Sequence, residues 1–463
     1  MDTITLVIQI IAALGGLVVA AMSISVLIRV HWPSPVMWSL KLCASALSLL
    51  FALVGAVITI VGLTTGSALI SALGIYDLLF FSIHRFRITR PPDRASSFEV
   101  AFGSNWENRI ASEQRKYFLP KRTAWRLPKV PVSRLQQNMA FSTIPGTQRQ
   151  LLCDFWQPPK NISPSGLAFI YLHGSAWYFL DKDLGTRPFF GHLAAQGHVI
   201  MDVAYRLAPE TDLMGMVHDT KRAIAWMKEN CAMYGVDPKQ IVVGGGSAGG
   251  HLGLLAAYTE GDPLFIPPEL EGKDTGVCAV ISMYGPADLE RMYYHTNQHL
   301  TTRETPGRPK KPVPTEMPKW LVKKMGKEFY RLGFDKGFVN AGNFAPLMGG
   351  HPDECPQTYA FFSPVTHVHS NCPPTFLIHG EHDVMAPVKS THDLYRRLAQ
   401  EKAQVVMHIL PQTDHAFDLI MPKLSPSAHN AIYDVERFLA LLVKGSDNEG
   451  LEVGTTKELQ LNY

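Results

Sequence analysis

Two uncharged stretches near the N-terminus limit what this chain can fold into. Residues 3–28 carry no charged side chain, and a second uncharged stretch lies between Lys41 and Asp77. About 20 apolar residues are enough for a helix to cross the hydrocarbon core of a bilayer. The second stretch is too long for one helix, and the sequence GLTTG at 62–66 predicts a turn inside it. We therefore expect a membrane anchor over residues 1–90 with three transmembrane helices, two being the alternative.

A cleaved signal peptide is the other interpretation of the first stretch. Signal peptides begin with a positive region and have an apolar core of about 7–15 residues. This chain begins with MDTIT, which carries no positive charge, and its apolar run is longer. The sequence favours an anchor, and we expect a multi-pass protein of the endoplasmic reticulum with the lipid bilayer as its partner.

A basic segment follows the apolar region. Between Arg85 and Arg134, lysine and arginine far outnumber acidic residues, and Trp106 and Trp125 lie among them. Positive charge and tryptophan beside a span are typical of a membrane interface. We expect residues 91–134 to form a basic interfacial linker, with an ordinary solvated linker as the alternative.

The rest of the composition excludes several classes of protein. The chain is 46% hydrophobic and 18% charged, which fits a folded protein, and its formal net charge of +3 does not indicate a nucleic-acid partner. None of the six cysteines forms a CxxC pair, which argues against zinc ribbons and disulfide scaffolds. His367 and His369 form an HxH pair without a third ligand at motif spacing. We expect no metal, no cofactor and no obligate protein partner.

Strand and helix patterns alternate after residue 135. Short apolar runs predict buried strands, and segments with helical apolar spacing lie between them. The strand runs are 167–172, 197–205, 241–243, 277–284, 375–379 and 404–410, and the clearest helices are 212–235 and 429–443. Such alternation indicates a mostly parallel sheet covered by helices on both faces. We expect an α/β catalytic domain over 135–445 and a flexible tail over 446–463.

One stretch interrupts this alternation. Residues 289–352 include the proline- and lysine-rich sequence TPGRPKKPVPTEMPKW. Long insertions between strands are usually functional or disordered. We interpret this one as a lid, with a disordered loop as the alternative.

A nucleophile motif lies between a predicted strand and a predicted helix. Residues 245–249 read Gly-Gly-Ser-Ala-Gly and match G-x-S-x-G. In strand–turn–helix context this motif presents a serine hydroxyl on a tight turn, and a glycine-rich turn without catalytic meaning is the alternative. Ser247 is the candidate nucleophile.

A serine nucleophile needs a base and an acid that orients the base. In this fold class they follow the serine in the order acid, then histidine. Asp383 follows the strand TFLIH and His415 follows the strand QVVMHIL, so both lie on post-strand loops. The rivals are Glu381 and Asp414 for the acid, and His379 and His382 for the base.

Donors for an oxyanion are predicted at two places. The sequence HGSAW at 173–177 follows the strand 167–172, where the amide of an oxyanion loop is expected. Gly174 and Ser175 offer closely spaced N–H groups there, and Ala248 offers another behind the nucleophile. We expect these three residues to form an oxyanion hole.

Together the motifs HGSAW, YRLAPE (205–210), GGSAGG, HGEHD (379–383) and DHAF (414–417) carry a family resemblance. Over residues 135–443 the chain resembles hormone-sensitive-lipase-like α/β-hydrolases, such as arylacetamide deacetylases and steryl acetyl hydrolases. Its N-terminus looks most like that of fungal membrane-anchored members. The resemblance implies the α/β-hydrolase fold, the triad Ser247, Asp383 and His415, and the oxyanion hole above. Two positions depart from the family pattern: Ser175 replaces a glycine, and Gly246 replaces an aspartate.

The resulting hypothesis is a membrane-anchored serine hydrolase that cleaves carboxylic esters, with short acyl groups on lipophilic alcohols as substrates. A natural-product enzyme of the same fold, such as a deacetylase, acyltransferase or cyclase of fungal secondary metabolism, is the first alternative. A binding protein built on an inactive hydrolase is the second, because a fold does not fix a function.

Overall fold

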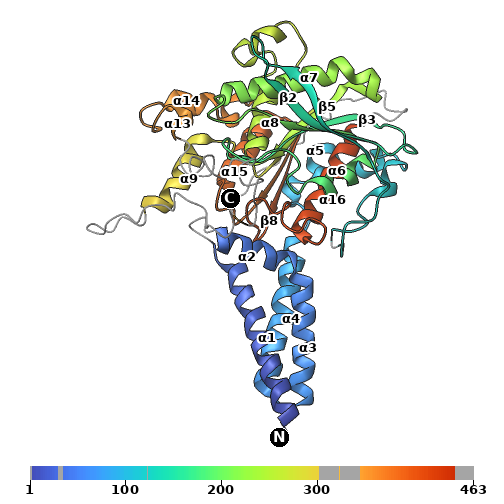
Figure 1. The fold of residues 1–463 in the computed structure, drawn as a ribbon, viewed down its shortest axis with the longest axis vertical. Helices are drawn as coiled ribbons and strands as arrows, with labels where there is room; N and C mark the ends of the chain where they lie inside the picture. The colour runs from blue at the N-terminus through green and yellow to red at the C-terminus, as the bar shows by residue number, and fades with distance from the viewer. Residues whose placement is uncertain (1–2, 30–34, 123, 302–322, 324–344, 444–463) are drawn as a thin grey trace.

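The protein is a helical stalk joined to an α/β domain (Figure 1). The structure, a computed structural model, describes residues 3–29, 35–122, 124–301, 323 and 345–443. The stalk contains α1 (Thr3–Leu27), α2 (Pro35–Ala46), α3 (Ser48–Thr64) and α4 (Ala68–Ile88). The helices α1, α3 and α4 run alongside one another away from the domain, and α2 lies at the end nearest to it (Figure 1).

The stalk differs from the predicted spans at one point. Two helices, α1 and α4, are long and apolar enough to cross a membrane, and the pair α2–α3 passes the same test only as a bent unit. The bend between Met37–Ala46 and Ser48–Thr64 is 72°. This bend was not predicted, because the uncharged stretch runs through the break without a proline or glycine there. The turn predicted at 62–66 is present, since α3 ends at Thr64 and α4 begins at Ala68.

Glycines let α3 and α4 pack backbone to backbone. A Cβ built on Gly62 lies 2.3 Å from the Ser71 nitrogen, and one on Gly74 lies 2.4 Å from the Thr59 nitrogen. Helices in lipid associate through such close approaches at small residues, because there is no hydrophobic effect to drive them together. These glycines therefore set the distance between the two helices.

Replacing Gly74 by leucine is expected to force α3 and α4 apart. Overpacking of this kind costs about 1–3 kcal/mol, and the clash is with backbone, which has no rotamer to change. Titration of the detergent-solubilised protein with SDS, followed by circular dichroism, measures the loss. The control is Gly15→Ala on α1, whose nearest neighbour is the Ile58 Cδ1 atom at 4.0 Å; equal stability of the two variants contradicts the packing argument.

The described residues of the domain form one eight-stranded sheet. Its order is β1-β2-β4-β3-β5-β6-β7-β8. The pairs β1–β2 and β2–β4 are antiparallel, and all other neighbours are parallel. The strands are β1 (Arg134–Thr143), β2 (Gln150–Gln157), β3 (Gly166–Leu172), β4 (Val199–Ala204), β5 (Val236–Gly246), β6 (Ala279–Met283), β7 (Thr375–Gly380) and β8 (Val405–Leu410). The predicted parallel sheet is present, and the antiparallel pair β1–β2 extends it at one edge.

Helices cover both faces of this sheet. One face packs on α7 (Leu213–Tyr234), α8 (Ala248–Tyr258) and α15 (Val388–Gln400), and the other on α6 (Arg187–Ala194) and α16 (Pro426–Leu442). Strand β3 shows why: its sequence GLAFIYL is apolar on both sides, and Leu167–Leu172 are all buried. A strand of this kind needs cover on both faces. The parallel order brings the carboxyl ends of β3, β5, β7 and β8 to one edge, where the candidate site residues lie.

The predicted linker is packed against the domain. Phe98, on α5 (Phe98–Phe102), packs against Phe376 of β7 with tilted rings whose centroids are 5.6 Å apart. The Leu119 amide donates to the Glu436 carboxylate at 2.9 Å, and Arg122 pairs with Asp434. The segment thus contributes to the core on the α16 face.

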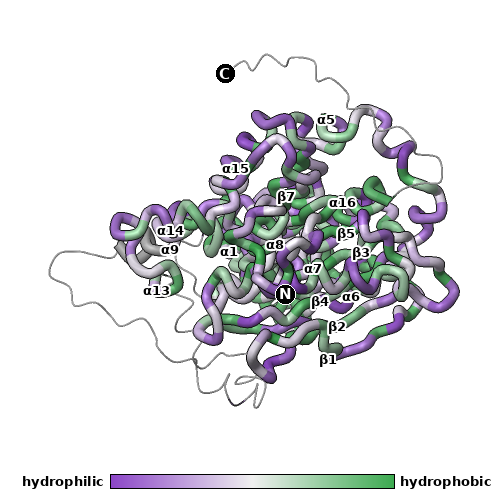
Figure 2. The backbone as a smooth tube through the Cα atoms, turned by 90° about the horizontal axis from the view of Figure 1, so that it is seen from above, coloured by the Kyte–Doolittle hydropathy of each residue, from purple (hydrophilic) through white to green (hydrophobic). Residues whose placement is uncertain are grey.

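Most of the predicted lid lies outside the described residues, as does the predicted tail. The described parts of the insertion are α9 (Leu289–Thr301), residue 323 and the segment from α13 (Ala345–Met348) onward. Seen along the stalk axis, α9, α13 and α14 (Pro356–Phe361) lie together at one side of the domain (Figure 2).

Candidate active site

Ser247 lies on a strained turn between β5 and α8. Its backbone angles are φ 53° and ψ −123°, a conformation that a residue with a side chain rarely adopts. Such strain persists only where the surrounding structure enforces it, and it is typical of functional sites. The turn places the serine hydroxyl outside the sheet, in front of the first turn of α8.

The three predicted triad residues meet in a hydrogen-bonded chain. The His415 Nε2 atom lies 2.9 Å from the Ser247 Oγ, and the Nδ1 atom lies 2.7 Å from the Asp383 Oδ2. A carboxylate only accepts hydrogen bonds, so Nδ1 carries the proton and Nε2 is free to accept from the serine. The other carboxylate oxygen, Asp383 Oδ1, accepts from the Met385 and Ala386 amides at 2.8 and 2.7 Å.

The rival residues occupy other places. Glu381 is 40% exposed and accepts from the Gln412 amide. His379 is buried, and its Nε2 lies 3.1 Å from the Asp383 Oδ2, so that it supports the acid without contacting Ser247. Asp414 is buried beside the His415 backbone and pairs with Lys41 of α2. His382 faces the same lysine.

Two of the candidate oxyanion residues, Gly174 and Ala248, lie directly beside the nucleophile. A Cβ built on Gly174 lies 3.3 Å from the Ser247 Cβ, which places this backbone directly beside the serine. Within the described residues, the Gly174 and Ser175 amides have no backbone acceptor. Ala248 is the first residue of α8, where helical N–H groups have no partner in the helix. The Gly174 and Ala248 amides thus lie beside the serine, and the Ser175 amide follows that of Gly174 in the same loop.

The serine that departs from the family pattern holds its own loop in place. The Ser175 hydroxyl donates to the Tyr205 hydroxyl at 2.7 Å and accepts from the Trp177 amide at 2.9 Å. Tyr205 in turn donates to the His173 carbonyl at 2.7 Å. The side chain at 175 therefore braces the loop, and the amide of the same residue remains free.

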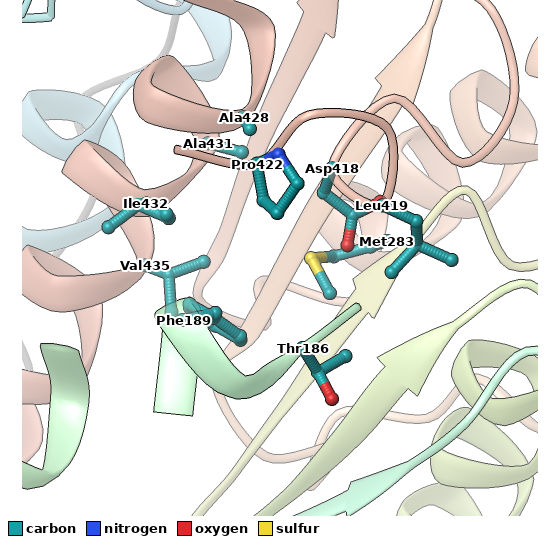
Figure 3. Close-up of a pocket in the computed structure, with 10 residues that line it drawn as sticks. All are labelled: Thr186, Phe189, Met283, Asp418, Leu419, Pro422, Ala428, Ala431, Ile432 and Val435. Carbon is teal, nitrogen blue, oxygen red and sulfur yellow. The ribbon is translucent and has the colours of Figure 1, made fainter. Parts of the chain in front are cut away.

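The second departure is explained by Tyr284. A Cβ built on Gly246 lies 2.7 Å from the Tyr284 hydroxyl, so a larger residue at 246 has no room. The Tyr284 ring packs on the His415 ring at a centroid distance of 4.6 Å. The Tyr284 hydroxyl donates a hydrogen bond to the Asp418 carboxylate. Asp418 also lies at an apolar cavity between α6 and α16 (Figure 3), which neither Ser247 nor His415 lines.

Two family models match this chain. The BD-FAE model covers residues 153–325, and the prolyl oligopeptidase family model covers residues 341–446. Together with the strand order and the turn at Ser247, they decide the class. The chain has the α/β-hydrolase fold.

Relatives of this α/β-hydrolase include esterases. The probable carboxylic ester hydrolase LipM of Mycobacterium tuberculosis is 33% identical over 303 residues, which are 65% of this chain and 60% of that protein. Esterase LipQ of the same organism is 30% identical over 66% of this chain and 64% of its own. The chain thus spans about six tenths of the length of these relatives. A solved esterase of Thermogutta terrifontis with butyrate bound is 19% identical, with a TM-score of 0.47, over 70% of this chain and 98% of that one.

Charge and burial set the protonation states in this α/β-hydrolase. Burial alone raises the pKa of Asp383, but the His415 charge and hydrogen bonds from His379 and His415 hold it well below its ordinary value. Burial acts to lower the pKa of His415, and the opposing charge and hydrogen bond of Asp383 raise it above its ordinary 6.5. The pair therefore favours an ionised acid next to a histidine that binds a proton readily.

The two histidines of the HxH pair, His367 and His369, form hydrogen bonds to backbone carbonyl groups of the α/β-hydrolase. The His367 Nε2 donates to the Phe361 carbonyl at 2.7 Å, and the His369 Nε2 to the Tyr258 carbonyl at 3.2 Å. In the part of the chain that the structure describes, no three histidines, cysteines or acidic residues gather as metal ligands. Both histidines fasten the loop before β7.

Proposed function

We propose that this protein is a serine hydrolase that cleaves carboxylic esters through an acyl-enzyme on Ser247. The observation that carries the proposal is the chain of hydrogen bonds from Ser247 through His415 to Asp383. A serine hydroxyl is a weak nucleophile until a base within hydrogen-bond reach takes its proton. The esterase relatives support the same chemistry.

Each residue has a defined role in the proposed reaction. His415 accepts the Ser247 proton as the hydroxyl attacks the ester carbonyl, and then donates it to the departing alcohol. Asp383 fixes the tautomer of His415 and stabilises the imidazolium. The amides of Gly174, Ser175 and Ala248 bind the negative oxygen of the tetrahedral intermediate. Water, activated by His415, then releases the acid from Ser247.

The stalk supports a membrane location for this activity. Large apolar side chains of α1, α3 and α4 point outward, among them Ile4 at 72%, Leu63 at 68% and Leu69 at 79% exposure. Such a surface is stable in lipid and costly in water. The proposal therefore includes a multi-pass anchor of the fungal type, in the endoplasmic reticulum, and substrates with a short acyl group on a lipophilic alcohol.

A fluorophosphonate probe tests the proposal directly. The full-length wild-type protein in detergent is expected to be labelled at a serine and to hydrolyse a short-chain acyl ester. Ser247→Ala is expected to lose both, because the nucleophile is removed while the fold is kept. An unlabelled wild type that hydrolyses no ester in a panel from short to long chains refutes the hydrolase and favours the binding-protein alternative.

The pH dependence follows from the protonation state of His415. The base must be neutral to accept the serine proton, so activity is lost as the pH falls through the pKa of His415. Because Asp383 raises that pKa, the acid limb of kcat/KM is expected above pH 6.5. A pH profile with a short-chain ester checks this. An acid limb below 6.5 contradicts the electrostatic argument.

A further inference from the structure

The helix α2 touches the two loops that carry Asp383 and His415. It lies between the three long stalk helices and the α/β domain (Figure 1). One loop, residues 381–387, follows β7, and the other, residues 411–418, follows β8. Two side chains of α2 reach them: Lys41 and Trp38.

Lys41 is a buried charge at the junction between the stalk and the domain. Its side chain is 1% exposed, and its Nζ lies 3.2 Å from the Asp414 Oδ2. The same atom donates to the His382 Nδ1 at 3.3 Å and to the Ile28 carbonyl, just beyond the end of α1, at 3.2 Å. One ammonium group therefore joins α1, α2 and both loops.

Asp414 connects this lysine to the triad. Its Oδ1 atom accepts from the Val384 amide at 3.0 Å and from the His415 amide at 2.8 Å. These amides belong to the residue after the acid and to the base itself. A single carboxylate thus fixes the acid loop relative to the base loop, and Lys41 fixes that carboxylate.

Trp38 makes a second contact with the base. Its indole Nε1 donates to the His415 backbone carbonyl at 3.0 Å. With the Asp414 bond to the amide of the same residue, both backbone polar groups of His415 are held. Further contacts from the stalk reach neighbouring loop residues, namely Arg29 to Glu381 at 3.3 Å and His84 to Gln412 at 3.0 Å.

We propose that Lys41 and Trp38 are positioning residues of the active site: acting through Asp414 and the His415 backbone, α2 fixes the two loops that carry the acid and the base. This inference rests on the proposed function. Catalytic groups must be held within fractions of an ångström, and the groups that hold them are part of the site. The membrane stalk is then a structural component of catalysis as well as an anchor.

A buried charge that has lost its partner is costly. Two ions out of water are stable only when they are paired, and removal of one partner leaves an uncompensated charge. Without Lys41, the Asp414 carboxylate must bind water or take up a proton. Either change shifts the Val384 and His415 amides, which donate hydrogen bonds to it. Without the Trp38 N–H, the His415 carbonyl loses its donor.

Two variants of the full-length protein test the inference in detergent. Lys41→Met keeps the length of the side chain and removes its charge, and Trp38→Phe keeps a ring and removes the donor. The rate on a water-soluble acetyl ester is divided by the number of sites titrated with a fluorophosphonate, so unfolded molecules do not count. We expect kcat per site to fall about tenfold in each, the scale of one lost hydrogen bond or charged contact, with KM unchanged.

A pH profile of kcat/KM adds a second measurement. The pH at which activity falls does not depend on how much of the protein is folded. The charged and titratable groups that face His415 or its partners include Asp383, Asp414 and Asp418 on the two loops, Tyr284 on its ring and His379 on Asp383. On the stalk side they include Lys41 of α2, with His382 and His84 next to it. In Lys41→Met, the Asp414 carboxylate faces the imidazole without its counter-charge. Burial raises the pKa of Asp414 and Lys41 opposes this. In the variant, Asp414 therefore either stays ionised and raises the pKa of His415 further, or takes up a proton and no longer raises it. In both cases the acid limb of kcat/KM is expected to move from its wild-type position.

The control is Leu40→Ala on the same helix, because Leu40 is 37% exposed. Its kcat per site is expected within twofold of the wild type. If Lys41→Met and Trp38→Phe also keep the wild-type kcat per site and acid limb, the inference is overturned while the hydrolase stands. A wild type that is neither labelled nor active refutes the proposed function itself, so the two failures are distinguishable.

Discussion

Asp383→Asn is expected to lower kcat on a short-chain ester by about 10⁴-fold, with little change in KM. The asparagine fits the same space, but its amide group can donate a hydrogen bond to the His415 Nδ1 atom, which carboxylate oxygens cannot. The histidine then carries its proton on Nε2, where it faces Ser247 and cannot accept. Steady-state kinetics, with circular dichroism to confirm an unchanged fold, measure the effect.

Glu381→Gln is the matched control for this variant. Glu381 lies two residues earlier on the same loop, is 40% exposed, and pairs with Arg29 at 3.3 Å. A pair this exposed contributes about 0–1 kcal/mol, because water and salt screen it. We expect its kcat to stay within a few-fold of the wild type. Near-normal turnover in Asp383→Asn together with a large loss in Glu381→Gln means that the acid is Glu381.

The sequence was sufficient for the parts of the site that depend on chain order. Parallel strands end at the same edge of a sheet, so residues that directly follow predicted strands had to gather there. This principle selected Ser247, Asp383 and His415, and the structure brings these three together. Their catalytic roles remain predictions that the variants above test.

Other features depend on contacts between segments that are far apart in the chain. Lys41 and Asp414 are separated by hundreds of residues, and nothing in either neighbourhood indicates the other. The sequence instead marked Lys41 as the charged end of an apolar stretch, and Asp414 as a rival acid. The close packing of Tyr284 on Gly246 could not be predicted for the same reason, because a glycine in the sequence does not indicate which distant residue packs against it.

Secondary structure was missed where its pattern is weak. The strands β1 and β2 were not predicted. β1 is mostly exposed and polar, and β2 is mostly buried but has Asp154 in the middle of its apolar run. The bend at residue 47 was missed because an apolar run looks the same whether its helix is straight or broken. In both cases the partner surface, and not the local sequence, decides the structure.

Gly245→Ala is expected to destabilise the protein by at least about 4 kcal/mol, the range of the most damaging substitutions. A Cβ at this position lies 2.0 Å from the Leu172 carbonyl oxygen. That oxygen belongs to β3, which is held between β4 and β5, so the backbone cannot move aside without breaking the centre of the sheet. The same contact exists on the other side of the nucleophile, where a Cβ on Gly249 lies 1.9 Å from that oxygen. Gly245 of β5 and Gly249 of α8 thus both allow their backbones to pack against the Leu172 carbonyl.

Thermal unfolding of the full-length protein in detergent measures this effect, and Gly261→Ala is its control. Gly261 has a positive φ, +72°, which Gly245 does not have, and a Cβ there meets nothing within 4 Å. Its cost is the conformational strain alone, about 1–2 kcal/mol. The comparison therefore separates backbone strain from the collision with β3. If the two alanine variants melt together, the tight packing behind Ser247 is not what requires glycine at 245. If Gly245→Ala melts many degrees lower, the nucleophile turn is held by the contact between Gly245 and the Leu172 carbonyl.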